Sequence, residues 1–439
     1  MHITKNSFSK RALLAVAITS TMFVAFGCGD KSGGDTTGAT GGATTGTAAT
    51  TGTPASGGAT GSTTAKRPET TVDGNKITGD TIPIGMVASL SGSLLPWGQD
   101  ELKGAQLAVD EFNAAGGANG KKVQLKFEDS QSKPESGKSA AEKLISEGVI
   151  GLVGEVASGI TAQIATPAFE KGIPVVAVGA TKTDLTDIGN NVFRVCYTDD
   201  FQGPVMAKFA FDQLHLKNVA LITDKKQPYS TFLSTKFRDY FTKLGGTIVD
   251  EEFYQTDDTQ FKGILTNVKA KNPDGLFMSG YFPEVGPLAR QANEVGLKVP
   301  MLGGDGWDSK DILKSGGDAI VGQYFCNHYN NMEDRPVVKD FLAKWQKKYG
   351  ALPGTTMGAL GYDAMMLTCQ ALKNDKTNDS KGLIAAIDST EGFKGVSGDI
   401  TLKGNNGNPP KRALVVQLDP KVGGSGQKFA KAYEHDAIK

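Results

Sequence analysis

Hydroxyl-bearing residues stand directly after two successive predicted strands, where they could bind a small anion. Ser158 follows the predicted strand 150–153 and begins a predicted helix, and Gly179, Ala180 and Thr181 follow the next strand. Ligands of open α/β sheets bind beyond the carboxyl ends of the strands, where helix N-termini offer unpaired N–H groups. Taken alone, Ser158 would be a helix cap and Thr181 a turn residue. Together they predict a site for a carboxylate.

The patterns that covalent, nucleotide or metal chemistry requires are missing from the sequence. Residues 137–139, Gly-Lys-Ser, resemble the end of a phosphate-binding loop, but Ser132 stands where that loop has a glycine. No predicted strand leads into a G-x-G-x-x-G segment, and Ser158 lacks a G-x-S-x-G context. The sequence therefore predicts no enzyme and no metal or organic cofactor. The histidines lie far apart: His2, His215, His328 and His435.

Predicted strands and helices alternate through most of the chain. This alternation, on either side of about residue 200, predicts an α/β fold with two doubly wound lobes and parallel central sheets. The length of 439 residues allows two or three domains, and equal numbers of basic and acidic residues (47 each) give no sign of a nucleic-acid partner. The predicted strands are 81–88, 122–128, 150–153, 174–178, 219–223, 247–253, 275–279, 300–303, 319–326, 398–402 and 413–418. The predicted helices lie near 97–115, 134–147, 159–171, 203–214, 229–244, 259–271, 283–295, 336–348, 356–372 and 381–388.

The N-terminus has the pattern of an export signal. Basic residues precede an apolar run over 12–26, which is shorter than the ~20 residues of a membrane-spanning helix. Cys28 directly follows Ala-Phe-Gly, which resembles the lipobox of bacterial lipoproteins, where the cysteine is lipidated. The alternative is an ordinary cleavage site beside an unrelated cysteine. We expect a lipoprotein signal peptide over 1–27, and a lipidated Cys28 followed by a disordered Gly/Thr/Ala/Ser linker over 28–76.

Short segments between residues 81 and 418 match, in the same order, segments of one known family. They are Ser89-Leu-Ser-Gly92, Gly104-Ala-Gln-Leu-Ala108, Asn113-Ala-Ala-Gly-Gly117, Gly179-Ala-Thr181, Arg194-Val-Cys-Tyr-Thr-Asp199, Gln202-Gly203, Asp274-Gly-Leu-Phe-Met-Ser-Gly-Tyr281 and Arg290-Gln-Ala-Asn-Glu-Val-Gly296. The chain thus resembles the branched-chain amino-acid receptors, which are type I periplasmic solute-binding proteins of ABC importers.

The resemblance implies an architecture in which the chain crosses three times between two lobes joined by a three-strand hinge. Lobe 1 would comprise residues 77–199 with 327–412, and lobe 2 residues 200–326 with 413–439. The ligand would lie in the cleft, and the lobes would close over it.

The resemblance also implies roles for individual residues. Ser158 and Thr181 would hold the α-carboxylate of an amino acid, and the carbonyl of Gly179, next to Ala180, would meet its ammonium. Asp305 would bind the ammonium, although the family pattern has Glu at this position and an exposed turn Asp is the alternative.

Three aromatic residues would line the side-chain pocket: Trp97, Tyr229 and Tyr281. Simple packing is the alternative for each, and the spacing around Tyr229 differs from the family by one residue. Trp97, between Pro96 and Gly98, is expected in a loop.

The resemblance implies a monomeric receptor that delivers a branched-chain or other aliphatic amino acid to the permease subunits of an ABC importer. Its location would be the periplasm or the outer face of the cytoplasmic membrane, with the inner leaflet of the outer membrane as a further possibility for the lipid anchor. Related receptors for urea, short amides or aromatic acids, and sensory receptors, remain open. Of Cys196, Cys326 and Cys369, at least one thiol should be free.

Overall fold

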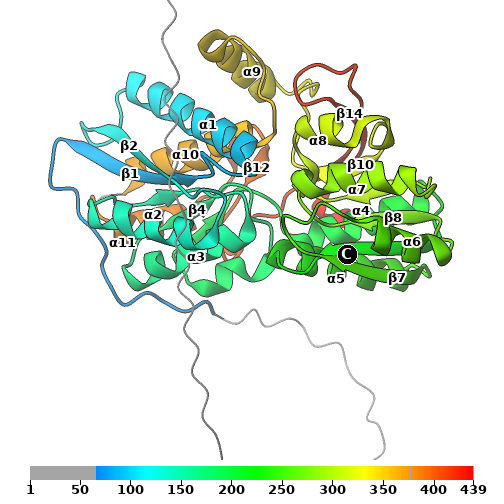
Figure 1. The fold of residues 1–439 in the computed structure, drawn as a ribbon. Coiled ribbons are helices and arrows are strands. Elements are labelled where there is room, and N and C mark those ends of the chain that lie inside the picture. Colours follow the sequence, from blue (N-terminus) through cyan, green and yellow to red (C-terminus); the bar gives the residue numbers. More distant parts are fainter. Residues whose placement is uncertain (1–65, 376, 439) are drawn as a thin grey trace, which may run out of the picture. The chain divides into compact units, whose positions relative to one another are not determined.

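The structure is a computed structural model that describes residues 66–375 and 377–438. The predicted signal peptide, Cys28 and the predicted linker up to residue 65 lie outside the described residues. Two lobes follow in the described part, each built around one central sheet (Figure 1). No helix in this part of the chain has the length and apolar character needed to cross a membrane.

Lobe 1 is built on a parallel sheet with the strand order β2-β1-β3-β4-β5. Strands such as β4 are continuous runs of buried apolar residues, as expected for a parallel sheet covered on both faces. The strand order reverses between β1 and β3, and such a switch point is where open α/β sheets bind ligands. The elements are β1 (Thr81–Ala88), α1 (Leu95–Ala114), β2 (Lys122–Asp129), α2 (Pro134–Ser146), β3 (Leu152–Val153), α3 (Ser158–Glu170), β4 (Val175–Ala177), the 3-10 helix η1 (Thr183–Ile188) and β5 (Val192–Arg194).

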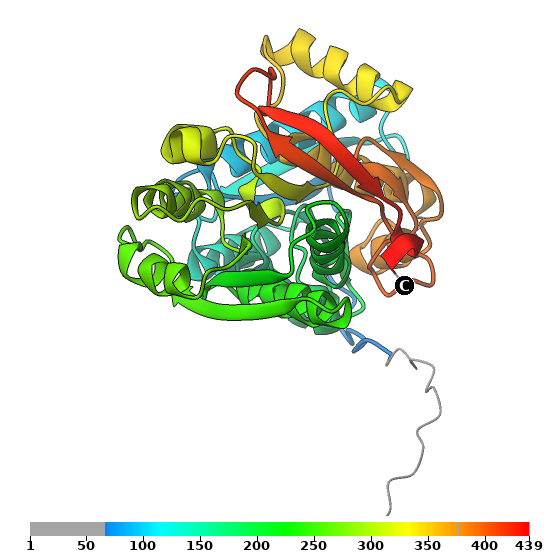
Figure 2. The ribbon, with the colours of Figure 1, turned by 90° about the vertical axis from the view of Figure 1, so that its right-hand side faces the viewer.

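Lobe 2 contains a mixed sheet in the order β14-β13-β10-β9-β8-β6-β7, in which β13 and β14 are antiparallel to their neighbours. Figure 2 shows the β13–β14 hairpin in red. The elements are α4 (Asp199–Asp212), β6 (Asn218–Asp224), α5 (Pro228–Lys243), β7 (Thr247–Tyr254), α6 (Lys262–Ala270), β8 (Gly275–Met278), α7 (Phe282–Glu294), β9 (Met301–Gly303), η2 (Asp305–Trp307), α8 (Asp311–Gly316), η3 (Gly317–Ala319), β10 (Tyr324–Asn327), β13 (Ala413–Leu418), β14 (Gln427–Tyr433) and η4 (His435–Ile438).

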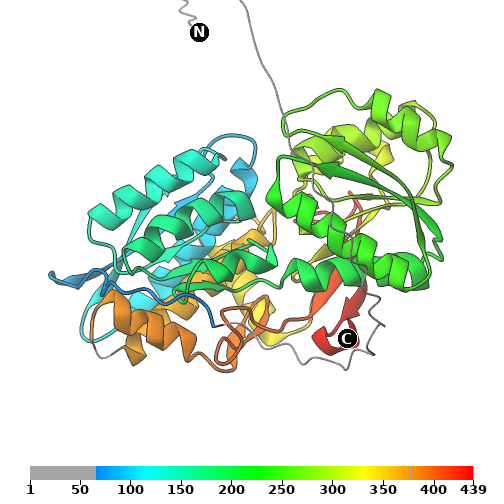
Figure 3. The ribbon, with the colours of Figure 1, turned by 90° about the horizontal axis from the view of Figure 1, so that it is seen from below.

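The chain returns to lobe 1 between β10 and β13, and Figure 3 shows these orange segments beside the blue and cyan ones. Glycines let the returning helix α10 approach α1 closely: a Cβ on Gly104 would lie 2.0 Å from the carbonyl oxygen of Gly358, and one on Gly361 would lie 2.3 Å from that of Glu101. The elements of this return are α9 (Pro336–Tyr349), α10 (Met357–Asn374), α11 (Ser380–Asp388), β11 (Phe393–Gly395) and β12 (Gly398–Ile400).

Three connections join the two lobes, after β5, after β10 and before β13. A buried lysine links the first of them to the third. The Nζ of Lys411 donates to the carbonyl of Val195 at 2.7 Å and to the hydroxyl of Ser397 at 2.6 Å. Burial lowers the pKa of Lys411 to about 8.

Residues 66–76, here called the strap, are held along lobe 1. Buried Arg67 donates to the carbonyl of Val192 at 2.6 Å and lies 3.3 Å from Asp388. The side chain of Asn75 donates to two carbonyl groups near the end of α2. The prediction of a disordered linker through residue 76 therefore does not hold for the strap, because side-chain hydrogen bonds to the lobe fix a segment that has little apolar surface.

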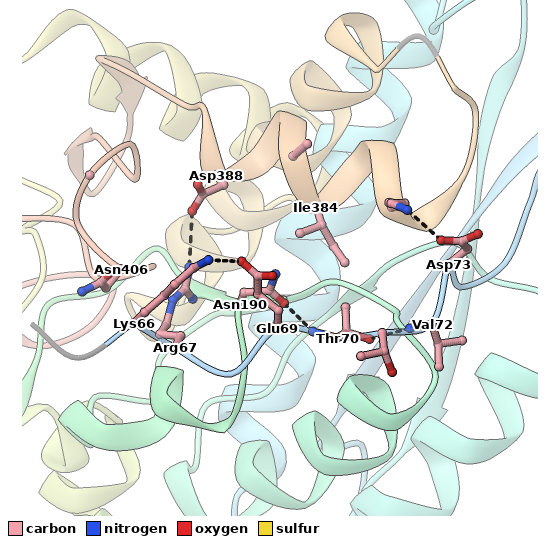
Figure 4. Close-up of a pocket in the computed structure, with 14 residues that line it drawn as sticks. Lys66, Arg67, Glu69, Thr70, Val72, Asp73, Asn190, Ile384, Asp388 and Asn406 are labelled. Atoms are coloured by element: carbon pink, nitrogen blue, oxygen red, sulfur yellow. Dashed lines mark hydrogen bonds and ion pairs between the residues drawn. The ribbon is translucent and has the colours of Figure 1, made fainter.

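A groove runs between the strap and α11 (Figure 4). Its charged groups pair with one another, as Lys66 with Glu69 at 2.5 Å and Lys381 with Asp73 at 2.9 Å. None of the residues predicted to bind a ligand lines this groove.

The predicted fold class is confirmed, and the prediction of β1 is correct at both ends. The strands β5, β11 and β14 were not predicted from the sequence. The strands β5 and β11 have three residues each, and β14 is an edge strand with mostly exposed side chains, so none of them shows a marked apolar pattern. The predicted strand 319–326 is shorter, because the chain forms η3 before β10 begins at Tyr324.

Candidate functional site

Ser158 and Thr181 lie close together at the carboxyl ends of β3 and β4. Ser158 begins α3, and its Oγ accepts a hydrogen bond from the N–H of Lys182 at 3.2 Å. Thr181 precedes Lys182 in the loop formed by residues 179–183, called here the 179–183 loop. Ser158 and Thr181 are at most 2% exposed. The N-terminus of α3 thus lies beside this loop, where its dipole favours an anion.

Asp305 follows β9 in lobe 2, and three side chains hold its carboxylate. Oδ1 accepts hydrogen bonds from Nε2 of Gln202 and from the hydroxyl of Tyr229, both at 2.9 Å. Oδ2 lies 3.0 Å from Nε2 of His328. Asp305 is 3% exposed, so its position is fixed by these partners rather than by solvent.

Gln202 joins Asp305 to a second carboxyl group. Its Nε2 lies 2.6 Å from Oδ1 of Asp199 and 3.4 Å from Oγ1 of Thr181. Burial, together with the charge of Asp305, raises the pKa of Asp199 to about 8. Asp199 is therefore mostly protonated at neutral pH.

His328 is fully buried and stacks on Tyr197, with ring centroids 4.0 Å apart. Burial lowers the pKa of His328, against the opposing effect of the neighbouring Asp305. The ring is therefore neutral at pH 7. We assign its hydrogen to Nε2, because Oδ2 of Asp305 is the acceptor there.

The three predicted aromatic residues form one cluster. Tyr229 and Tyr281 are stacked with ring centroids 5.0 Å apart, and the rings of Trp97 and Tyr281 are T-shaped with centroids 5.2 Å apart. The hydroxyl of Tyr229 also accepts a hydrogen bond from the N–H of Gly306 at 3.0 Å. The indole N–H of Trp97 donates to the carbonyl of Asp308 at 2.6 Å, which joins lobe 1 to lobe 2.

Trp97 is not in a loop, as the sequence suggested, but in the first turn of α1. Pro96 is compatible with this position, because the first residues of a helix have no intrahelical acceptor for their N–H groups. The helix therefore begins two residues earlier than expected and directs the indole toward lobe 2.

A small cavity of about 10 Å³ lies where these groups meet, and five of the predicted residues line it. A Cβ on Gly179 would lie 2.9 Å from Cγ1 of Val156 and 3.1 Å from Sδ of Met357, so only glycine leaves this wall of the cavity undisturbed. The lining residues are Trp97, Val156, Gly179, Tyr229, Tyr281, Asp305, Gly306 and Met357. All of them are buried, so the two lobes are closed over the cavity.

Three of the predicted residues, Ser158, Ala180 and Thr181, do not line the cavity. Ala180 packs in a small apolar cluster with Ala165, Ala177, Leu185 and Val192. Sequence reasoning missed Val156, Met357, Gln202 and His328. Val156 and Met357 are apolar residues that look like core residues in a sequence. Gln202 stands in a segment that matches the family, which was the available signal. The thiols of the described residues are free and buried: Cys196, Cys326 and Cys369.

Comparisons with known proteins agree with this geometry. The family described as "Periplasmic binding protein" matches residues 81–427. A Leu/Ile/Val-binding protein homolog of Brucella melitensis is 31% identical over 322 residues, which are 73% of this chain and 86% of that protein. The structure of the leucine-binding protein LivK of Thermotoga maritima aligns with this chain at a TM-score of 0.75 and 32% sequence identity. The alignment covers 81% of this chain and 99% of LivK. LivJ of Streptococcus pneumoniae, solved with isoleucine, has a TM-score of 0.74 and 31% identity, with the same coverage.

Proposed function

The chain belongs to the periplasmic binding protein family, together with Leu/Ile/Val-binding proteins, and from this premise we propose that it is the branched-chain amino-acid receptor of an ABC importer. The observation that carries the proposal is that one cavity is lined both by Gly179, in the loop that is hydrogen-bonded to Ser158, and by Asp305, a carboxyl side chain of the other lobe. An α-amino acid is a zwitterion, and its burial requires partners for both charges.

The remaining walls suit an aliphatic side chain. Trp97, Tyr281, Val156 and Met357 offer apolar surface, and each buried CH₂ group contributes about 0.8 kcal/mol. The ligand needs no covalent chemistry from the protein, so binding and release would depend on the lobes alone.

Lobe closure would be the mechanical signal to the transporter. The lining residues come from both lobes, so a ligand can meet all of them only when the lobes are closed. The three connections between the lobes would act as the hinge. We propose lobe 1 as residues 77–199 with 327–412, and the distribution of strands between the two sheets supports this division.

The location follows from the family and from the N-terminal pattern. The protein would work outside the cytoplasm, and a lipid on Cys28 would tether it to a membrane as a monomer near its permease. Cys28→Ala tests the tether: the variant should appear in the soluble fraction of cells that hold the parent protein in the membrane fraction.

Calorimetric titration with leucine, isoleucine and valine tests the ligand class. Leucinamide, 4-methylpentanoate, urea and benzoate form the comparison set. A preference for the three amino acids over leucinamide and 4-methylpentanoate is expected, because each analogue lacks one charge. Binding of urea or benzoate alone would contradict the proposal and favour a related receptor. The aromatic residues around the cavity would then account for the binding of an aromatic acid. A sensory role would show as normal binding with no uptake defect in cells that lack the protein.

A further inference from the structure

Arg194, the last residue of β5, donates three side-chain hydrogen bonds to the 179–183 loop. Nη1 donates to the carbonyl of Ala180 at 2.7 Å, and Nη2 donates to the carbonyls of Lys182 at 2.9 Å and Thr183 at 3.1 Å. The side chain is 0% exposed. Arg194 therefore lies directly behind the loop that carries Thr181, on the side of the site predicted to hold a carboxylate.

This guanidinium forms no ion pair among the described residues. Of the two nearby carboxyl groups, Asp199 is mostly protonated at neutral pH, and Asp184 is half exposed and paired with Lys182. The Nε of Arg194 also has no acceptor. Burial lowers the pKa of Arg194, but an arginine keeps its charge in proteins. A buried positive charge without an anionic partner is costly, so its presence here calls for a counter-charge.

The loop provides the connection between this charge and the ligand site. The peptide group between Ala180 and Thr181 is planar, so its N–H lies opposite the carbonyl that Arg194 binds. When the carbonyl end of a peptide dipole faces a cation, its N–H end points away from that cation. The N–H ends therefore favour an anion on the far side of the loop.

We propose that Arg194 is the positive counterpart of the ligand carboxylate, which it stabilises through the 179–183 loop without touching it. Arg194 is thus a positioning residue. The inference rests on the proposed function in that it needs a ligand with a carboxylate beside Ser158 and Thr181. It goes further in assigning the charge that balances this carboxylate to a residue outside the cavity.

The test compares leucine with leucinamide, which keeps the ammonium and the side chain but lacks the carboxylate charge. Arg194→Met should weaken leucine binding about tenfold and leucinamide binding less than twofold, so that the affinity ratio of the two ligands falls. Arg194→Lys keeps the charge but cannot make three directed hydrogen bonds, and it should lower the ratio by about threefold. If Arg194→Met does not fold, the leucine-to-leucinamide affinity ratio of Arg194→Lys tests the proposal instead.

Arg67→Met is the matched control. Arg67 is also buried and also donates to carbonyl groups of lobe 1, those of Gly189 and Val192, but it does not contact the 179–183 loop. Its loss should lower thermal stability and leave the leucine-to-leucinamide ratio unchanged. Equal losses for leucine and leucinamide in the Arg194 variants would overturn the proposal, since a purely structural residue would affect both ligands alike.

The same titrations separate this inference from the proposed function. If the parent protein binds no branched-chain amino acid but does bind benzoate, the proposed function fails. Arg194→Met must then still weaken benzoate binding by about tenfold for the Arg194 proposal to stand. If the parent protein binds only a ligand without a carboxylate, such as urea, both are overturned.

Discussion

Nε2 of His328 lies 3.0 Å from Oδ2 of Asp305, so a buried imidazole supports the carboxylate that we assign to the ligand ammonium. The pair makes the folded protein sensitive to acid. Burial lowers the pKa of His328 below its ordinary value of 6.5, so the folded protein binds this proton more weakly than the unfolded chain. Its contribution to stability is complete above about pH 6.5 and is lost as the pH falls toward the lower folded value.

His328→Gln can keep a donor near Asp305 and cannot titrate. We expect the melting temperature of the parent protein to fall more steeply than that of the variant between pH 7 and pH 5, in parallel thermal melts. Asp305 and Lys411, the charged groups that act on the pKa of His328, are present in both proteins, so the difference reports on His328. If the melting temperatures of the two proteins fell in parallel over this pH range, the titration of His328 would not be the cause of the acid sensitivity.

Removal of the Asp305 carboxylate should weaken amino-acid binding at least tenfold, or about 1.4 kcal/mol. Asp305→Ala leaves the ammonium without its anionic partner in a buried site. Calorimetric titration with leucine measures the effect. Asp318, an exposed residue of η3 in the same lobe, offers a matched control, and Asp318→Ala should bind leucine like the parent. An unchanged affinity in Asp305→Ala would exclude the ammonium role.

Tyr229→Phe separates the hydroxyl from the ring. The ring keeps its stacking on Tyr281, but the hydrogen bonds to Asp305 and from Gly306 are lost. Because a hydrogen bond contributes about 1 kcal/mol net, we expect the melting temperature to fall modestly and leucine affinity to fall between about threefold and tenfold. A loss of folding instead of affinity would show that the hydroxyl serves packing alone.

Asp199→Asn should change how stability depends on pH. The pKa of Asp199 is raised to about 8, so the folded protein holds this proton while the unfolded chain releases it near pH 4. Stability from this group is thus highest at low pH and is lost as the pH rises from about 4 toward about 8. The asparagine variant lacks this slope, so chemical denaturation should show a variant whose advantage over the parent grows from pH 5 to pH 8.

The strap should contribute to the stability of lobe 1. A chain that begins at Lys66 keeps the hydrogen bonds of Arg67 and Asn75, and one that begins at Ile77 loses them. We expect the longer chain to be more stable by a few kcal/mol, at about 1 kcal/mol for each buried hydrogen bond, as measured by urea denaturation. Equal midpoints would mean that the strap lies on lobe 1 without stabilising it.

The alternation of strands and helices in the sequence was enough to predict two α/β lobes, because each parallel strand needs a crossover helix and a continuous apolar core. The positions of Ser158 and Thr181 were predictable for the same reason, since parallel strands bring their carboxyl ends to one edge of a sheet. Asp305 and the aromatic residues came from the resemblance to a family rather than from any pattern of their own.

Only the tertiary structure brought the supporting residues to these positions. Gln202 is 103 positions from Asp305 in the sequence, and Arg194 is a charged residue in a strand too short to be recognised. Their roles depend on which side chains meet inside a closed, buried interface. Sequence periodicity reports which face of an element is apolar, but it contains no information on which buried polar groups will satisfy one another across a hinge.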